Sequence, residues 1–280
     1  VRGEQVTFSG GVPTIWTMYL THLEQAGEDA GTLKRLVIAG SAVPRVMAET
    51  FQKRYGVEVR QLWGMTETSP LGVVATPTPK LASQGGDVVD EMIWTRQGRL
   101  QFGIEVRIVD DKGVDVPRDG VSVGTLLVRG PWTIERYYRS ESSAVDAAGW
   151  FDTGDIATLD VYGFVRLTDR KNDLIKSGGE WISSIDLENI AVACPGVRLA
   201  AVVGVRHPKW EERPVLIVEL HAGQSVSSQQ IIDYLDGKIV KWWTPDAVII
   251  AEVPLTSTGK IDKKVLRLRY HDLLAGETRP

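Results

Sequence analysis

The chain has 280 residues, of which 43% are hydrophobic and 24% charged, a composition typical of a globular protein of one to three domains. Its net charge of −4, without long runs of like charge, argues against nucleic acid as the main partner. Apolar runs such as Leu199–Val205 are too short for a transmembrane segment, and no secretory signal opens the sequence. The single cysteine, Cys194, excludes an internal disulfide framework, so we expect a reducing, cytoplasmic setting. Nothing in the sequence indicates an oligomeric state.

The first third of the chain alternates between strand-like and helix-like patterns. Leu33–Ser41 is typical of a buried strand that ends in small residues, and Val57–Gly64 of a second strand. Between them, apolar residues recur at every fourth position from Met47 to Tyr55, which predicts a helix closed by Gly56. This order predicts a βαβ unit in a parallel sheet, where ligands bind beyond the carboxyl ends of the strands.

The rest of the chain has a different pattern. Short β-like runs separated by Asp, Gly and Pro turns predict a small antiparallel or barrel-like subdomain. The later segments predict a compact α+β unit, with helices at about 184–193 and 229–243 and strands at about 199–205, 215–220 and 248–253. We therefore expect a fold with α/β and α+β parts: a large domain at 1–168, made of a βαβ portion at about 1–80 and a β-rich subdomain at about 81–168, and a C-terminal domain at 169–280.

A Thr-Glu pair follows the second predicted strand, within Gln61–Pro70. The hydroxyl of Thr66 and the carboxylate of Glu67 can together contact a phosphate and hold Mg²⁺, which prefers a few carboxylates combined with substrate phosphates. Trp63 would then be placed to stack on a base. An ordinary strand-to-loop turn, with Trp63 as a core aromatic, explains the same residues.

Two further segments combine charge with glycine. Gly149–Ala157 places Asp155 in a predicted tight turn, and a carboxylate there can accept hydrogen bonds from a ribose diol or only stabilise the turn. Asp169–Ser183 begins with a charged run typical of a solvated face. Gly178 and Gly179 follow that run, and their backbones can approach a ligand closely or change conformation.

The stretch Pro254–Lys264 reads PLTSTGKIDKK and predicts a polar turn before a basic helix. A solvated side chain is the simplest interpretation of Lys260. The Gly-Lys pair does not form a Walker A phosphate loop, because that motif needs glycine at the position of Pro254 and Ser or Thr at that of Ile261.

Five motifs occur in a fixed order along the chain: GSAVP, WGMTET, GWFDTGD, DRKNDLIKSGGE and PLTSTGK. This set resembles the AMP-forming acyl-adenylating superfamily, which contains acyl-CoA synthetases, adenylation domains of peptide synthetases and beetle luciferases. The resemblance covers essentially the whole chain. GMTETSPLG and IKSGGEWISSIDLEN are most similar to the medium- and long-chain fatty acyl-CoA ligase branch.

The resemblance implies a nucleotide site shared among several motifs. Glu67 would hold Mg²⁺, Thr66 would contact the α-phosphate, and Lys260 would meet the carboxylate and α-phosphate during adenylation. The residues implied to contact ATP or AMP are Gly40, Ser41, Ala42, Gln61, Leu62, Trp63, Gly64, Met65, Thr66, Asp155, Arg170 and Lys260, with Asp155 and Arg170 at the ribose and Trp63 where the family usually has tyrosine.

The resemblance also implies a second half-reaction with CoA. Asp169 would be the hinge about which the C-terminal domain rotates, bringing a second catalytic lysine, Lys176, into place of Lys260. The residues implied to line the pantetheine tunnel are Lys176, Ser177, Gly178, Gly179, Glu180 and Trp181. The implied activity is therefore ATP-dependent conversion of a carboxylic acid to acyl-AMP and then to acyl-CoA.

Two alternatives remain open. One is an adenylation domain that loads a carrier protein, although no carrier serine motif follows Lys260. The other is a non-catalytic nucleotide- or CoA-binding module. The chain retains Glu67, Asp155, Arg170 and Lys260, which such a module could lose without harm to its fold, and this favours an active parent enzyme.

The sequence also departs from the family pattern. Asp152 stands where a basic residue is common, and Gln101 and Phe102 replace common prolines. No Ser/Thr/Gly-rich phosphate loop ending in Pro-Lys-Gly is present, and the sequence starts without methionine. We therefore expect this chain to be the C-terminal half of a ligase, inactive by itself.

Overall fold

The computed structural model describes residues 1–275. The chain divides into two compact units, Val1–Thr168 and Asp169–Pro280. The boundary falls inside strand β9 (Phe164–Arg170), beside the residue that the resemblance implies as a hinge, Asp169.

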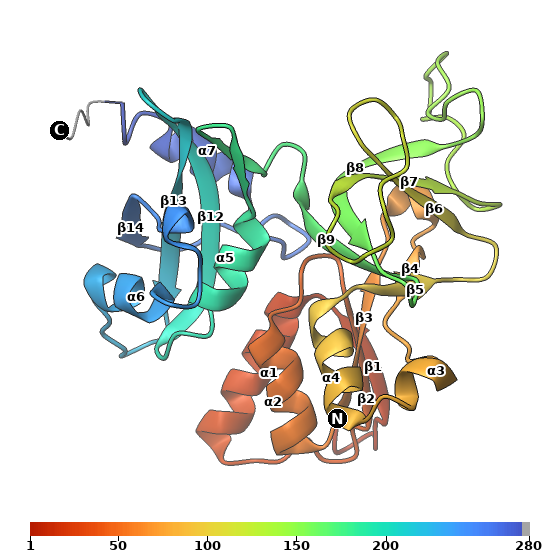
Figure 1. Ribbon diagram of the computed structural model, residues 1–280. Helices are drawn as coiled ribbons and strands as arrows, with labels where there is room; N and C mark the ends of the chain where they lie inside the picture. The colour runs from red at the N-terminus through yellow and green to blue at the C-terminus, as the bar shows by residue number, and fades with distance from the viewer. Residues whose placement is uncertain (276–280) are drawn as a thin grey trace. The chain divides into compact units, whose positions relative to one another are not determined.

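The first unit contains a nine-stranded sheet in the order β1-β2-β3-β4-β5-β9-β8-β7-β6 among the described residues (Figure 1). Its parallel part consists of β1 (Phe8–Gly11), β2 (Arg35–Ala39) and β3 (Glu58–Trp63). The same sheet continues, mainly through antiparallel pairs, into β4 (Val73–Val74), β5 (Gly98–Leu100), β9, β8 (Phe151–Leu159), β7 (Gly124–Arg129) and β6 (Glu105–Val109). The predicted α/β class and antiparallel segment are confirmed. The antiparallel strands continue the parallel sheet, with β1 and β6 at the two ends of the strand order.

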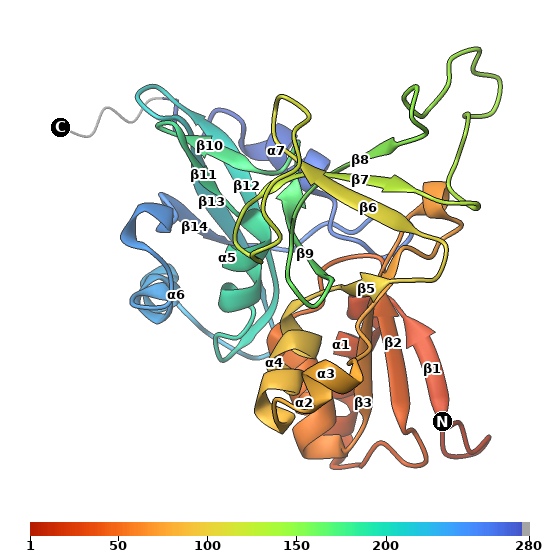
Figure 2. The same ribbon diagram turned by 45° about the vertical axis from the view of Figure 1, so that its right-hand side comes forward.

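Helices cover one side of the parallel strands. Figures 1 and 2 both show α1 (Pro13–Ala26), α2 (Arg45–Tyr55) and α4 (Gly86–Thr95) on this side, with the short α3 (Pro79–Ala82) before α4. Alternate residues of β2, Leu36 and Ile38, are fully buried in the same core as Phe51 of α2. Gly56 ends α2 with a φ of 66°, a left-handed conformation that glycine adopts without strain, as the sequence predicted.

The second unit contains a five-stranded sheet among its described residues, in which β14 joins the strand order β11-β10-β13-β12 by pairing with β13. Its strands are β10 (Ile175–Ser177), β11 (Glu180–Ile182), β12 (Val197–His207), β13 (Glu211–Leu220) and β14 (Ala247–Ile250). Its helices are α5 (Ser184–Ala191), α6 (Ser228–Leu235) and α7 (Lys263–Tyr270).

The sheet of the second unit is buried on both faces. Ala200 and Val202 of β12 belong to the core that includes Leu187 of α5 and Ile231 of α6, whereas the intervening Ala201 belongs to the core that includes Leu266 of α7. Since successive side chains of a strand point to opposite faces, this arrangement requires apolar residues at nearly every position. It explains the continuous apolar run at Leu199–Val205.

The helix predicted over 229–243 is wrong in its second half. Helix α6 ends at Leu235, and Gly237 follows with a φ of 71°, a conformation that does not continue a helix. The chain then forms a short 3₁₀ turn at Lys241–Trp243 (η2). This break places Trp242 in contact with the second unit's core, where its ring meets that of Trp210 edge to face.

Candidate active site

Two of the candidate segments meet at the carboxyl edge of the parallel strands. Because Ala39 of β2 lies opposite Leu62 of β3, the segments 40–42 and 64–67 follow these two strands at the same edge of the sheet. Gly40 has a φ of 93°, which turns the chain from β2 toward α2, and Ser41 is exposed. The first unit therefore presents both segments at the edge where open α/β sheets bind ligands.

A tight turn after β3 depends on two glycines. A Cβ at Gly64 would lie 1.5 Å from the carbonyl oxygen of Pro70, and a Cβ at Gly72 would lie 2.5 Å from the ring of Trp63. The turn begins with the 3₁₀ helix η1 (Thr66–Thr68), at whose start the N–H of Met65 donates to Thr68 Oγ1 (3.0 Å). This geometry leaves Thr66 exposed and Glu67 partly exposed.

Replacing Gly64 by alanine is expected to destabilise the first unit severely, by about 4 kcal/mol or more, because the clash is with backbone rather than with a movable side chain. Urea unfolding followed by tryptophan fluorescence measures the change. Gly10→Ala on β1 is the matched control, since its Cβ would make only ordinary contacts at 3.5 Å or more. Equal stability of the two variants would contradict the role of Gly64.

Asp155 lies in strand β8, so its predicted place in a tight turn is wrong. The pairing of β7 with β8 shifts between Thr125 and Leu127, which leaves an irregular bulge around Gly154. Gly154 has a φ of 71°, and its N–H donates to Asp152 Oδ1 (2.9 Å). Gly154 and Asp152, which suggested a turn, therefore form a β-bulge. A bulge changes the direction in which a neighbouring side chain points.

The bulge brings Asp155 to Trp63, although the two are 92 residues apart in sequence. Trp63 Nε1 donates to Asp155 Oδ2 at 2.9 Å, and Asp155 is only 2% exposed. The N–H of Asp155 donates to Thr153 Oγ1 (3.1 Å), which in turn donates to the carbonyl of Leu126 (2.8 Å). Trp63 is thus a core aromatic and also the residue that holds the candidate ribose carboxylate.

The side chain of Gln61 has a structural task. It is 1% exposed, and its Nε2 donates to the carbonyls of Ile93 (3.1 Å) and Trp94 (2.7 Å) in the last turn of α4. These carbonyls have no partner within the helix, so Gln61 satisfies them. Gln97 Nε2 donates in turn to Gln61 Oε1 (3.4 Å). The side chain of Gln61 is therefore directed to α4. Only the backbone of Gln61 could then contribute to the predicted ATP- or AMP-binding site.

The sequence prediction missed a loop that holds the Thr-Glu turn. Tyr137 Oη donates to Glu67 Oε1 (2.9 Å), and the N–H of Ile134 donates to the Glu67 carbonyl (2.7 Å). Trp132 Nε1 donates to the carbonyl of Leu71 (2.9 Å). The hydrogen bond to Glu67 raises the pKa of Tyr137, with a further contribution from burial. Because these partners lie 61 to 70 residues from the turn, no local sequence pattern could reveal them.

Glu67 is the candidate metal ligand. Within residues 1–275 no group of three or more Asp, Glu, His or Cys side chains is arranged to hold a metal ion. A single carboxylate fits Mg²⁺ bound mainly through substrate phosphates and water, which is how this ion is commonly held.

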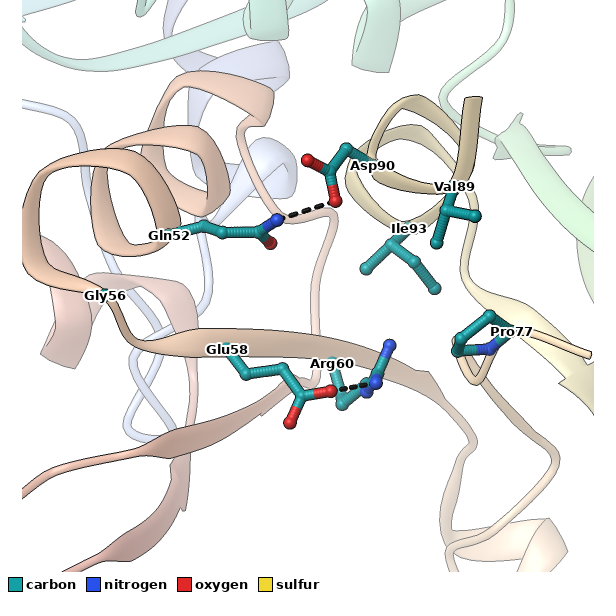
Figure 3. A pocket seen from close by; sticks show the side chains of 8 residues that line it. All are labelled: Gln52, Gly56, Glu58, Arg60, Pro77, Val89, Asp90 and Ile93. Carbon is teal, nitrogen blue, oxygen red and sulfur yellow. Dashed lines mark hydrogen bonds and ion pairs between the residues drawn. The ribbon is translucent and has the colours of Figure 1, made fainter. Parts of the chain in front are cut away.

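A cavity of about 270 Å³ lies elsewhere in the first unit (Figure 3). It is lined by Gln52, Gly56, Glu58, Arg60, Pro77, Val89, Asp90 and Ile93, near the amino end of β3. Gln52 Nε2 donates to Asp90 Oδ1 (2.6 Å), and Arg60 pairs with Glu58. The lining includes none of the candidate site residues.

In the second unit, the candidate CoA segment is a hairpin. Lys176 of β10 lies opposite Trp181 of β11, and its Nζ is 4.8 Å from the centroid of the Trp181 ring, a cation–π contact. Gly178 and Gly179 form the turn with φ values of 58° and 87°. Ser177 is fully buried, whereas Trp181 is exposed.

Lys260 occupies a hydrogen-bonded turn between β14 and α7. Leu255 and Ile261 form an antiparallel bridge, and the N–H of Thr256 donates to the carbonyl of Lys260 (2.7 Å). The N–H of Lys260 donates to Thr256 Oγ1 (3.1 Å), and Gly259 has a φ of 78°. The small polar residues therefore shape the turn, and Lys260 is exposed.

Two family profiles match this chain: AMP-binding enzyme over residues 1–138, and AMP-binding enzyme C-terminal domain over residues 186–260. The chain belongs to the AMP-binding enzyme family. The resemblance inferred from the five ordered motifs is thereby confirmed.

Several AMP-binding enzymes are similar to this chain over nearly its whole length. It is 46% identical to 3-methylmercaptopropionyl-CoA ligase of Ruegeria lacuscaerulensis, over 97% of this chain and 50% of that protein. It is 43% identical to medium-chain-fatty-acid–CoA ligase of Ectopseudomonas oleovorans, over 98% and 50%. The crystal structure of ATP-bound MatB from Rhodopseudomonas palustris matches with a TM-score of 0.82 and 27% identity, over 97% of this chain and 52% of that one. The chain thus spans about half the length of the curated relatives it matches.

A charge network joins the candidate hinge to α7 in the C-terminal unit of this AMP-binding enzyme. Lys263 Nζ lies 2.8 Å from Glu188 Oε1 and donates to Ser184 Oγ (2.5 Å). Asp169, 2% exposed, accepts from the N–H of Ser184 at Oδ2 (2.6 Å). Burial raises the pKa of Glu188 to about 7, against the opposing effect of Lys263. Burial also raises the pKa of Asp169, whereas the pKa of Lys263 is raised because Glu188, Asp169 and Asp173 together outweigh its burial.

The network predicts a pH-dependent stability. Between pH 4.5 and about 7, folded Glu188 keeps a proton that the unfolded chain releases, so its contribution to the free energy of unfolding falls as pH rises through this window. The fall is at most about 3 kcal/mol. Urea unfolding at about pH 5, 6, 7 and 8 should therefore give a steeper decline for the unsubstituted protein than for Glu188→Gln, which does not titrate. Parallel profiles would contradict a raised pKa at Glu188.

No helix of the part of the chain that the structure describes is both long and apolar enough to cross a membrane.

Proposed function

We propose that the chain supplies the C-terminal half of an AMP-forming acid–CoA ligase, which activates a carboxylic acid as acyl-AMP and transfers it to CoA. The observation that carries the proposal is the contact between Trp63 and Asp155 beside the Thr66–Glu67 turn. It brings the Trp63 indole and the Asp155 carboxylate together next to the exposed hydroxyl of Thr66, and these groups would serve the base, the ribose diol and a phosphate of a nucleotide. Family membership and the relatives' names support the same reaction.

In the first step, the acid's carboxylate attacks the α-phosphorus of ATP and pyrophosphate leaves. Thr66 would donate its hydroxyl to an α-phosphate oxygen, while Asp155, with Arg170, would fix the ribose. Glu67 would hold Mg²⁺, which supplies charge neutralisation on the phosphates. Lys260 would place its ammonium beside the carboxylate and α-phosphate, so positioning and charge stabilisation carry the step.

In the second step, the thiol of CoA attacks the acyl carbonyl and AMP leaves. Here the hairpin of Lys176 and the two glycines, Gly178 and Gly179, would face the pantetheine arm, together with Ser177, Glu180 and Trp181. We propose that a rotation about Asp169 exchanges Lys260 for this hairpin.

The proposed substrate is an apolar acid of the medium- or long-chain fatty class. The motif at Gly64–Gly72 and the similarity to a medium-chain-fatty-acid–CoA ligase support this class. The similarity to a 3-methylmercaptopropionyl-CoA ligase adds short thioether acids to the proposed substrates. Loading of a carrier protein is the competing function.

The proposal is tested with the full-length protein that contains this chain. Acid-dependent exchange of pyrophosphate into ATP, measured across straight-chain acids of increasing length, identifies the acid that is activated. Addition of free CoA should then release acyl-CoA. Exchange without acyl-CoA formation would instead support the carrier-loading alternative, and no exchange with any acid would contradict the proposal.

A further inference from the structure

Arg213 is a buried cation that neither proposed half-reaction uses. It lies on β13, is 7% exposed, and its guanidinium contacts two other segments of the second unit, β10 and residues 242–246. Nε donates to Asp246 Oδ1 (2.8 Å), Nη1 to Ser177 Oγ (3.0 Å) and the carbonyl of Trp242 (3.0 Å), and Nη2 to the carbonyl of Thr244 (3.0 Å). A planar group with donors in a fixed fork can make these bonds at once, which the single ammonium of lysine cannot.

Two tryptophans extend this support to the glycine turn. The N–H of Gly178 donates to the carbonyl of Trp210 (3.0 Å), and a Cβ at Gly178 would lie 3.0 Å from the Trp210 ring and 3.3 Å from that of Trp242. The two rings meet edge to face with centroids 4.9 Å apart, and the Arg213 guanidinium lies 4.7 Å from the centroid of Trp242. Gly178 is therefore packed against the rings of Trp210 and Trp242, and the ring of Trp242 is packed in turn against Arg213.

The turn needs such support because of its composition. Gly178 and Gly179 are consecutive residues with positive φ, and glycine restricts backbone conformation least of all residues. Ser177 before the turn is bound by Arg213, and Gly178 within it is bound by Trp210. Because β10 and β11 are only three residues each, the hairpin itself offers few bonds to fix the turn (Figure 2).

We infer that Arg213 and Trp210 are positioning residues for the glycine turn at 178–179 and that they act on transfer of the acyl group to CoA, leaving adenylation unaffected. This inference rests on the proposed function of the hairpin. The physical reason is geometric: the thiol must reach the acyl carbonyl along a path bordered by this turn, and a displacement of about 1 Å can slow a reaction about a hundredfold.

The first test substitution is Arg213→Lys, which keeps the positive charge but removes the planar guanidinium and its fixed set of hydrogen-bond donors. In the full-length enzyme, the rate constant for transfer from pre-made acyl-AMP to CoA is expected to fall about tenfold to a hundredfold, with adenylation changed less than about twofold. The fall should appear in kcat of the transfer step, while the KM for ATP in pyrophosphate exchange stays unchanged.

The matched control is Arg198→Lys. Arg198 of β12 donates through Nε to Glu219 Oε1 of β13 (2.9 Å), at the other end of these paired strands from Arg213. The control makes the same chemical change in the same unit, but the Arg198 side chain bonds to Glu219 rather than to the hairpin that carries the glycine turn. Both half-reactions should therefore keep their rates.

A second pair of variants tests the turn without altering charge. Trp210→Leu removes the ring that lies against Gly178 and should slow transfer to CoA. Trp210→Phe retains an aromatic ring at this position and should keep most of the transfer rate. Thermal unfolding of every variant shows whether it is folded at the assay temperature.

The outcomes separate the inference from the proposed function. Selective loss of transfer in Arg213→Lys and Trp210→Leu supports the inference. Unchanged transfer, or equal loss of both half-reactions in the folded variants, overturns the inference while the ligase assignment stands. Failure of the unsubstituted enzyme to form acyl-CoA overturns the proposed function itself.

Discussion

Replacing Lys260 by alanine is expected to abolish adenylation in the full-length enzyme while thioester formation from pre-made acyl-AMP survives. Lys260 is exposed on a turn that its neighbours hold by hydrogen bonds, so its removal costs little packing. Loss of one preorganised charge at a developing transition state commonly costs about a hundredfold to a thousandfold in rate. Pyrophosphate exchange measures the first half-reaction, and acyl-CoA release from supplied acyl-AMP measures the second.

Lys264→Ala is the control for this prediction. Lys264 is exposed in the first turn of α7, four positions after Lys260, and carries the same charge. Its removal should leave both half-reactions within about twofold, because surface substitutions of this kind usually have small effects. Equal loss of the two half-reactions in Lys260→Ala would show that the lysine acts on the fold or on binding in general.

Replacing Lys263 by methionine is expected to lower the free energy of unfolding by about 3 kcal/mol or more. The substitution keeps the length of the side chain but leaves the buried Asp169 and the mostly buried Glu188 without their cation. Removing one partner of a buried pair is strongly destabilising because the remaining charge is uncompensated. Urea unfolding of the chain at about pH 8, above the pKa of about 7 for Glu188, measures the full effect.

Two comparisons check the cause of that loss. Lys264→Met makes the same chemical change on the exposed side of α7 and should alter stability by less than about 0.5 kcal/mol. The double variant Lys263→Met with Glu188→Leu removes both charges of the pair and should recover part of the loss. A single variant as stable as the Lys264 control would contradict a stabilising network at the candidate hinge.

Local pattern was sufficient to predict much of the fold. The apolar repeat from Met47 to Tyr55 and Gly56 predicted α2 and its end, because the helix period and the left-handed cap are local properties. Short β-like runs separated by turn residues likewise predicted the antiparallel segment of the first unit, which contains β6 and β7. The helix expected after Gln229 stops early, since Gly237 and the packing of Trp242 outweigh the apolar pattern.

The candidate site was less predictable, because its contacts join distant parts of the chain. Ordered motifs pointed to Trp63 and Asp155 separately, yet nothing local indicated that the indole holds the carboxylate. The same is true of Tyr137 on Glu67 and of Arg213 on Ser177, since both supporting residues lie outside any recognised motif. Asp155 was expected in a tight turn within Gly149–Ala157, whereas the pairing with β7, which lies far away in the sequence, places it in β8 beside a bulge.

The nucleotide products of the full-length protein test the central proposal most directly. With ATP, Mg²⁺, CoA and a carboxylic acid that the enzyme accepts, we expect acyl-CoA and AMP in equal amounts, together with pyrophosphate, and loss of all three products in Lys260→Ala. Formation of ADP and phosphate, or acyl-CoA formation that does not consume ATP, would contradict an AMP-forming ligase.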